Sequence, residues 1–292
     1  MIPVAQIIQW RTNAPWPDDM QVEQDLILSR ILVEIFSDPT LNKELAFRGG
    51  TALHKLFFSP PARYSEDIDL VRTSKGAIKD IVDGLRNRLE PWLGKPKTVR
   101  TSRSFKLFFY FNPENSHNIR LRIKIEINIT ENFSVLDRFF KDFYVKSDWF
   151  TGQTQINTFH FEELIATKLR ALYQRNKGRD VFDLWLALKQ EQFNIKKVIT
   201  VFEHYMKKEG NTINREQFEK NLNLKLKENS FLDDIGPLLS NELKLAHRSS
   251  PVTEKGNFIA TLEKNGLTTN EWNLVDAAEE IKTKILIHLP KV

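Results

Sequence analysis

Residues 45–56 read LAFRGGTALHKL, and this stretch decides the fold. An apolar segment leads into two consecutive glycines, and helix-forming residues follow them. The order predicts a short strand, a glycine turn and a helix. Two glycines let the backbone approach a ligand closely, and the N-terminus of the following helix offers free N–H groups to phosphate oxygens. Gly49, Gly50 and Thr51 are therefore candidate phosphate-binding residues.

Residues 63–72 read RYSEDIDLVR and predict a strand, because polar and apolar residues alternate with a period of two. The alternation places Asp67 and Asp69 on one face, roughly 6.6 Å apart along the backbone. Paired carboxylates can share metal ions, and their hard oxygen donors suit Mg²⁺. A phosphate cradle beside such a pair is the equipment for transferring a nucleotidyl group from an NTP.

The segments around these two motifs predict an α+β fold. Helical periodicity covers residues 20–37 and 76–92, and strands are predicted at 104–111 and 119–130, the second with isoleucines at alternate positions. From about residue 161 the pattern is helical. We expect a nucleotidyltransferase-type α/β domain over residues 1–158, with a mixed sheet and helices, followed by an all-helical domain over residues 159–292.

The composition of the chain limits the kinds of catalytic chemistry and the cellular location that we expect. The 292 residues carry a formal charge of +5, which favours polyanionic partners only weakly, and no cysteine, which excludes thiolate nucleophiles and cysteine-ligated zinc. No apolar run approaches the roughly 18 residues of a membrane span, and no signal peptide is visible. We expect a cytoplasmic protein. The aromatic residues at 105–111 are expected to be sheet core rather than a base-stacking surface, since only Lys106 is interleaved with them.

Taken together, the strand, Gly-Gly-Thr turn, helix and Asp-x-Asp strand resemble the polymerase-β-like nucleotidyltransferase superfamily. The fuller strings at residues 47–53 and 63–70 resemble the AbiEii/AbiGii toxin family of bacterial abortive-infection and toxin-antitoxin systems. The resemblance covers about residues 22–188. It implies two Mg²⁺ ions held by Asp67 and Asp69, an NTP bound at the glycine turn and at Arg63 and Ser65 of the second string, and a separately encoded antitoxin.

The superfamily also places a third carboxylate on a later strand. Glu126 is the candidate, because it lies on the polar face of the strand predicted at 119–130. The resemblance implies that it is a metal ligand or the base. The alternative is a solvated charge beside Lys124.

Lys168 falls on the apolar stripe of the helix predicted at 161–175. A lysine that faces inward needs an anion, unless its amine reaches water along the helix surface. The resemblance implies a contact with the NTP phosphates.

A polar string at residues 179–184, RDVFDL, matches a string that the family places in the active site. The resemblance implies that Asp180 or Asp183 orients Lys168 or a metal ligand. Arg175, Lys177 and Arg179 would then contact triphosphate or acceptor RNA, with solvated loop charges as the alternative. By itself the string predicts a new helix capped by Asp180, with Asp183 in a position like that of a capping box.

The resemblance thus implies a toxin that transfers a nucleotide from an NTP to RNA, such as the 3′ end of tRNA. Two alternatives stay open: a nucleotidyltransferase with a protein or small-molecule acceptor, and an inactive nucleotide-binding or interaction protein of the same fold. The presence of Asp67, Asp69, Glu126 and Lys168 together argues against the inactive protein.

Overall fold

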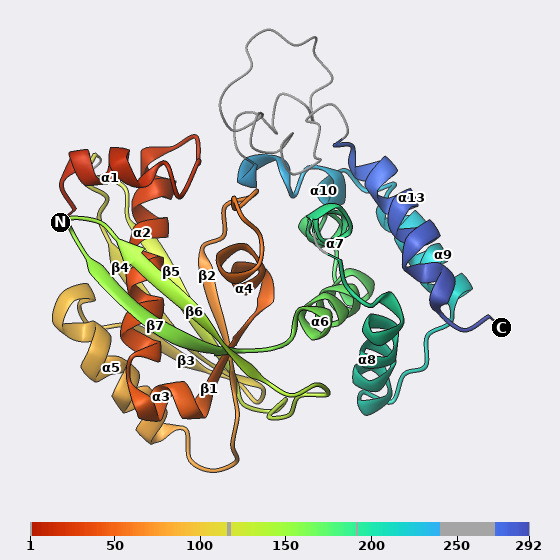
Figure 1. Ribbon diagram of the computed structural model, residues 1–292, viewed down its shortest axis with the longest axis horizontal. Coiled ribbons are helices and arrows are strands. Elements are labelled where there is room, and N and C mark those ends of the chain that lie inside the picture. Colours follow the sequence, from red (N-terminus) through yellow and green to blue (C-terminus); the bar gives the residue numbers. More distant parts are fainter. Residues whose placement is uncertain (1, 116–117, 191, 240–271, 292) are drawn as a thin grey trace, which may run out of the picture. The chain divides into compact units, whose positions relative to one another are not determined.

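The computed structural model describes residues 2–115, 118–190, 192–239 and 272–291. The chain divides into two compact units, Met1–Phe159 and His160–Val292 (Figure 1). The predicted fold class is confirmed, because the first unit holds a mixed sheet with helices and the described part of the second is helical. Within the described ranges, no helix combines the length and the apolar character needed to cross a bilayer.

The first unit is built on one sheet of strand order β3-β4-β5-β2-β1-β7-β6 in the described residues. In it, β2 pairs with β1 antiparallel and with β5 parallel, and β1 pairs with β7 parallel. The elements are α1 (Val4–Trp10), α2 (Asp19–Phe36), α3 (Pro39–Glu44), β1 (Leu45–Arg48), α4 (Gly49–Leu56), β2 (Asp67–Arg72), α5 (Lys79–Leu93), β3 (Lys97–Arg100), β4 (Ser104–Phe111), β5 (Leu121–Asn128), β6 (Phe139–Lys146) and β7 (Thr151–Thr158).

The two faces of the sheet differ in burial because side chains alternate along each strand. In β5 the three odd-numbered isoleucines, Ile123, Ile125 and Ile127, are fully buried. They share their face with Ile68 and Leu70 of β2, their partners in the register. The apolar side of α5 is buried and α5 lies next to β4, while α2 runs along β5, β6 and β7 (Figure 1). The even-numbered side chains of β4 and β5 lie on the opposite face and are mostly half-buried.

Several boundaries differ from the sequence prediction. The strand predicted at 63–72 begins only at Asp67, so Arg63 and Ser65 precede the strand. Helix α3, which the sequence did not predict, begins at Pro39, and its N-terminus is capped by the Asp38 side chain. Strands β3, β6 and β7 were not predicted, because their apolar and polar residues do not alternate clearly.

The second unit packs its helices around a buried apolar core that includes Leu169, Phe182 and Phe202. Its elements are α6 (Phe161–Gln174), α7 (Arg179–Gln190), α8 (Ile195–Lys208), α9 (Arg215–Lys225), α10 (Asn229–Leu232), the 3₁₀ turn η1 (Gly236–Leu238), α13 (Leu274–Lys284) and the 3₁₀ turn η3 (Leu286–His288). These confirm the helical pattern expected from about residue 161, including the helix predicted at 161–175 and the new helix predicted from the string at 179–184. The last part of the all-helical domain predicted over residues 159–292 lies partly outside the described residues.

Candidate functional site

The glycine turn between β1 and α4 is held directly against a carboxylate. Gly49 has φ +82°, a conformation that suits glycine, and a Cβ at this position would lie 2.6 Å from Oδ2 of Asp69. Helix α4 begins at Gly49 and carries no side-chain cap at Arg48. The sequence feature that predicted a phosphate cradle therefore also makes room for the side chain of Asp69.

Thr51 joins the start of α4 to the start of β2. Its side chain is buried, its hydroxyl donates a hydrogen bond to the backbone carbonyl of Asp67, and it lies 2.7 Å from Oγ of Ser65. The Thr51 hydroxyl is thus engaged inside the protein, and a phosphate contact at this residue would come from its backbone N–H. Arg63 is also buried and donates to the carbonyl of Tyr64, so its guanidinium supports the chain that enters β2.

Three carboxylates meet on the half-exposed face of the sheet. Asp67 and Asp69 lie two residues apart on β2, and Asp69 is the register partner of Glu126 on β5. Lys124, the register partner of Asp67, places its Nζ 3.1 Å from Oδ2 of Asp67 and 3.1 Å from Oε2 of Glu126. Nζ of Lys106 on β4 lies 3.2 Å from Oε1 of Glu126. The structure therefore brings together the three predicted metal ligands and adds two lysines.

The charges of this cluster shift the pKa values in opposite directions. Burial raises the pKa of Asp69; Lys124 opposes the rise and the negative charge of Asp67 adds to it. Burial alone would raise the pKa of Glu126, but hydrogen bonds from Ser104, Lys124 and Lys106 outweigh it and hold the pKa below its ordinary value. Burial would lower the pKa of Lys124, but the two aspartates raise it. The site is electrostatically coupled, as active sites commonly are.

The donor set fits a hard cation. Carboxylate oxygens are the ligands that Mg²⁺ prefers, and the ammonium of Lys124 shows that the space between Asp67 and Glu126 attracts positive charge. As the side chains stand, no group of three or more His, Asp or Glu residues in the described ranges is arranged to hold a metal ion. Metal binding by Asp67, Asp69 and Glu126 would therefore require Lys124 to move its ammonium away from two of them.

Lys124 is a member of this cluster that the sequence did not predict. The alternation of β5 places it on the face of Glu126 but indicates only a neighbouring charge. Its pairing with Asp67 depends on the parallel register of β2 and β5, which joins residues more than fifty positions apart.

In the second unit, Lys168 lies between two buried carboxylates. Its side chain is 5% exposed, and its Nζ lies 3.0 Å from Oδ1 of Asp180 and 2.9 Å from Oδ2 of Asp183. Arg175 adds hydrogen bonds of 2.7 and 2.8 Å to Asp180. Burial would raise the pKa of Asp180, but Lys168 and Arg175 together hold it below its ordinary value. The anions that an inward-facing lysine needs are thus present, and a phosphate contact of Lys168 stays a prediction.

Two predictions about the start of α7 need correction. Helix α7 begins at Arg179, and the carboxylate of Asp180 accepts hydrogen bonds from Lys168 and Arg175 instead of capping the helix, because the buried lysine needs it. Lys177 and Arg179 both pair with Asp234, at 3.0 and 3.3 Å, so neither is a purely solvated loop charge.

Replacing Gly49 by alanine tests the contact with Asp69. We expect a loss of about 1–2 kcal/mol in the free energy of unfolding from the positive φ, and about 1–3 kcal/mol more from the overlap with the carboxylate. Gly94 is the matched control, because its φ is +77° and a Cβ there meets nothing within 4 Å. Urea denaturation of both variants measures the difference. Equal losses of unfolding free energy in the two variants would show that the Asp69 side chain moves aside without cost.

Asp69→Asn should stabilise the protein at neutral pH. The folded pKa of Asp69 is raised, so its contribution to stability is complete below the unfolded pKa of about 3.9 and is lost as pH rises through the folded pKa. We expect the variant to melt about 2–4 °C above the wild type near pH 7, and the gap to close as the pH falls toward about 4. Melting curves over a pH series test this. A variant less stable than wild type near pH 7, or a similar gain in the exposed control Asp142→Asn, would contradict it.

Lys168→Met leaves Asp180 and Asp183 buried without their lysine. Removing one partner of a buried ion pair costs about 3–5 kcal/mol, and we expect a loss of that order in the free energy of unfolding. Lys196→Met, on the exposed side of α8, is the control and should change little. Chemical denaturation measures the free energy of unfolding of both variants. Similar losses in the two would overturn the structural role of Lys168.

Comparisons with known proteins identify the family of this chain and proteins of similar fold. The family model described as "Nucleotidyl transferase AbiEii toxin, Type IV TA system" matches residues 30–252. The nucleotidyltransferase toxin MenT4 of Mycobacterium tuberculosis has a similar fold, with TM-score 0.55 and 13% identity over 99% of this chain and 98% of that one. JHP933 of Helicobacter pylori has TM-score 0.50 and 14% identity over 93% and 92% of the two chains. A search of curated protein sequences finds no match. Since the family model covers most of the sequence, the chain belongs to the AbiEii family of nucleotidyltransferase toxins of type IV toxin-antitoxin systems.

Proposed function

We propose that this nucleotidyltransferase toxin transfers a nucleotide from an NTP to an RNA acceptor in a Mg²⁺-dependent reaction. One observation carries the proposal: the fold places Asp67, Asp69 and Glu126 on one face of the sheet, with the backbone of Gly49 in contact with Asp69. Hard oxygen donors beside a glycine turn and a helix N-terminus suit the binding of a metal-chelated triphosphate.

In this proposal Asp67, Asp69 and Glu126 hold two Mg²⁺ ions. Such ions neutralise the triphosphate and lower the pKa of the attacking hydroxyl when they are bound. Asp69 is fixed in place by Gly49, whereas Glu126 is oriented by Ser104, Lys106 and Lys124. Because the pKa of Glu126 is held low, we propose it as a metal ligand rather than as the base.

The glycine turn binds the triphosphate through its backbone. Gly49 and Gly50 open α4, so their N–H groups precede the first hydrogen-bonded turn of the helix. Thr51 keeps this turn in register with Asp67 through its buried hydroxyl. We propose that the arrangement positions the phosphates next to the carboxylates without a side chain from the turn itself.

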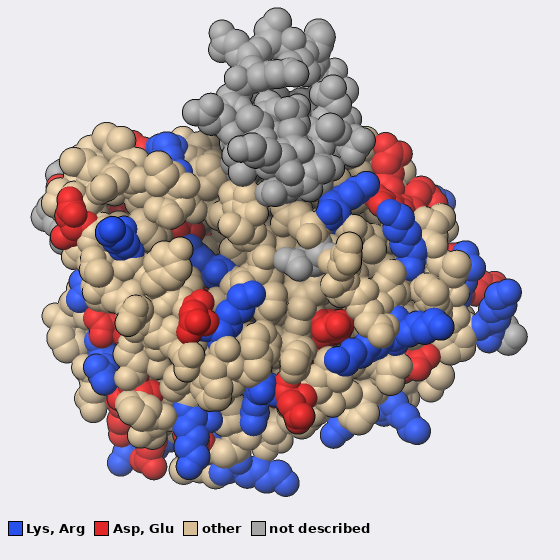
Figure 2. Space-filling model, in the orientation of Figure 1, with Lys and Arg blue, Asp and Glu red and all other residues tan. Residues whose placement is uncertain are grey.

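An RNA acceptor, such as the 3′ end of tRNA, is consistent with the charge of the chain. The formal charge is +5, but basic and acidic side chains are interspersed on the face shown in Figure 2. Overall charge therefore supports a polyanion only weakly, and the local surface beside the carboxylates carries more weight. The family implies an antitoxin as the cellular partner of this enzyme.

The test is to incubate the protein with Mg²⁺, each labelled NTP in turn and total cellular RNA. We expect label in RNA with at least one NTP, its loss with a chelator, and its return with added Mg²⁺. The double variant Asp67→Asn/Asp69→Asn should lower the rate on the order of 100-fold or more, because it removes two ligands of the proposed metal site.

Asp142→Asn, which changes an exposed carboxylate on β6, is the control for the loss of negative charge. If no NTP gives labelled RNA, RNA is rejected as the acceptor. Label found in a protein or in a small molecule would identify that molecule as the acceptor instead. Transfer that persists in the double variant would reject the site.

A further inference from the structure

Two aromatic side chains lie on the same face of the sheet as the carboxylates. Phe108 and Tyr110 occupy even positions of β4, and both are half-buried, whereas Phe109 between them is fully buried in the core. The register aligns Phe108 with Lys124, and Lys124 with Asp67. Two strand spacings therefore separate the backbone of Phe108 from that of Asp67, or roughly 10 Å.

Basic side chains surround these two rings. Cζ of Arg120 lies 4.8 Å from the centre of the Tyr110 ring, and Nζ of Lys97 lies 5.7 Å from it. Cζ of Arg122 lies 5.4 Å from the centre of the Phe108 ring. Lys97, Arg120 and Arg122 are all exposed. The two rings and these three cations are called the aromatic platform below.

The structure divides the aromatic residues at 105–111, which were expected to be sheet core rather than a base-stacking surface, between the two faces of the sheet. That expectation depended on the lack of basic residues within the segment itself. The structure supplies them from β3 and β5, which lie beside β4 in the sheet, and from Arg120, the residue just before β5. Phe109 confirms the core prediction, while Phe108 and Tyr110 face the other way.

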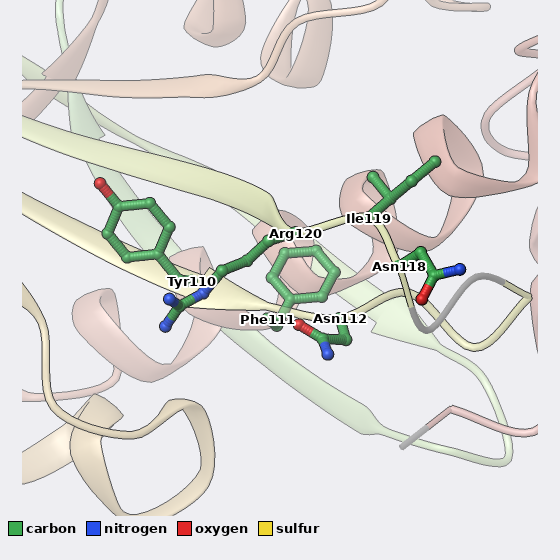
Figure 3. A pocket seen from close by; sticks show the side chains of 6 residues that line it. All are labelled: Tyr110, Phe111, Asn112, Asn118, Ile119 and Arg120. Atoms are coloured by element: carbon green, nitrogen blue, oxygen red, sulfur yellow. The ribbon is translucent and has the colours of Figure 1, made fainter.

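An open hollow of about 570 Å³ continues from Tyr110 at the end of the β4–β5 hairpin. Figure 3 shows the guanidinium of Arg120 next to Tyr110, with the amide side chains of Asn112 and Asn118 farther along. Amides can form hydrogen bonds with base edges, and aromatic rings can stack on bases of any sequence. The hollow therefore extends the platform with groups that suit a nucleotide.

We infer that the aromatic platform binds the single-stranded 3′ segment of the RNA acceptor and leads its terminal hydroxyl to Asp67, Asp69 and Glu126. The inference rests on the proposed function and names the surface that holds the acceptor. Phe108 and Tyr110 are two residues apart on β4, roughly 7 Å, so each ring can stack one base. Lys97, Arg120 and Arg122 neutralise the phosphates between those bases.

The chemistry favours a single strand over a duplex. Bases stack on aromatic side chains only where they are unpaired, and sheet faces that carry aromatic rings are a common way of binding such segments. Going from the platform along this face of the sheet, the first acidic side chains are Asp67 and Glu126. Both belong to the proposed catalytic cluster and are paired with Lys124. The platform itself carries only positive charge, which complements a phosphate backbone.

The experiment measures binding without turnover. Fluorescence anisotropy of a short labelled single-stranded RNA with a free 3′ hydroxyl is recorded without Mg²⁺ or NTP. We expect Phe108→Leu and Tyr110→Leu each to raise Kd about tenfold, as for the loss of one stacked base. Arg122→Gln should reduce the slope of log Kd against log salt concentration by about 0.7.

Tyr144→Leu is the matched control, because Tyr144 is 76% exposed and lies on β6, the edge strand at the opposite end of the sheet from β3. Its Kd should equal that of the wild type. Melting temperatures and Mg²⁺-NTP binding show whether each variant is folded. If a leucine variant does not fold, Arg120→Gln and Arg122→Gln, which change exposed residues, decide instead.

The outcomes separate this inference from the proposed function. If the platform variants bind RNA as well as the wild type does, or if Tyr144→Leu weakens binding equally, the platform is overturned. Nucleotide transfer to RNA can still be observed in that case, and the surface would then be available to a protein partner. Absence of RNA binding by the wild type also overturns it. Platform-dependent binding by a wild-type protein that transfers no nucleotide overturns the proposed function and leaves the platform in place.

Discussion

The contact between the backbone of Gly49 and the carboxylate of Asp69 is the constraint on which the candidate active site depends. It holds the start of α4 against β2, and the buried hydroxyl of Thr51, two residues further along the helix, holds the same two elements together. A side chain at residue 49 would separate them. Asp69 is also buried, and this burial raises the pKa of its carboxylate. The packing around Asp69 therefore both fixes the carboxylate in place and makes its negative charge costly.

Charge balance is the second principle of this protein. In the first unit, Lys124 and Lys106 neutralise carboxylates that would otherwise repel one another on neighbouring strands. In the second unit, Asp180 and Asp183 neutralise a lysine that is almost completely buried. Buried charges are tolerated when they are paired, and removing one partner costs more than the pair contributes. The cluster of the second unit is consequently sensitive to the loss of any single member, whereas in the first unit the loss of the Asp69 charge removes a repulsion.

The two faces of the sheet carry different groups. The odd positions of β4 and β5 are apolar and form the core with β2, whereas the even positions carry Glu126, the two lysines, Phe108 and Tyr110. Asp67 and Asp69 of β2 lie on the same face as these even positions. The proposed chemistry and the proposed acceptor binding thus share one face, at distances set by the strand spacing. Because side chains alternate with a period of two, substitutions on the functional face can change specificity with little effect on the core.

The sequence by itself determined the glycine turn, the Asp67 and Asp69 pair, the isoleucine alternation of β5 and the helices α6 to α8, because each depends on residues close together in the chain. It also pointed to Glu126 and Lys168 through a family resemblance. Only the tertiary structure decided that Lys124 lies between Asp67 and Glu126. It also decided that Asp180 binds Lys168 instead of capping a helix. The same holds for the contacts of Phe108 with Arg122 and of Tyr110 with Arg120. These pairings depend on register between distant strands and on the needs of buried charges, and local sequence patterns contain neither.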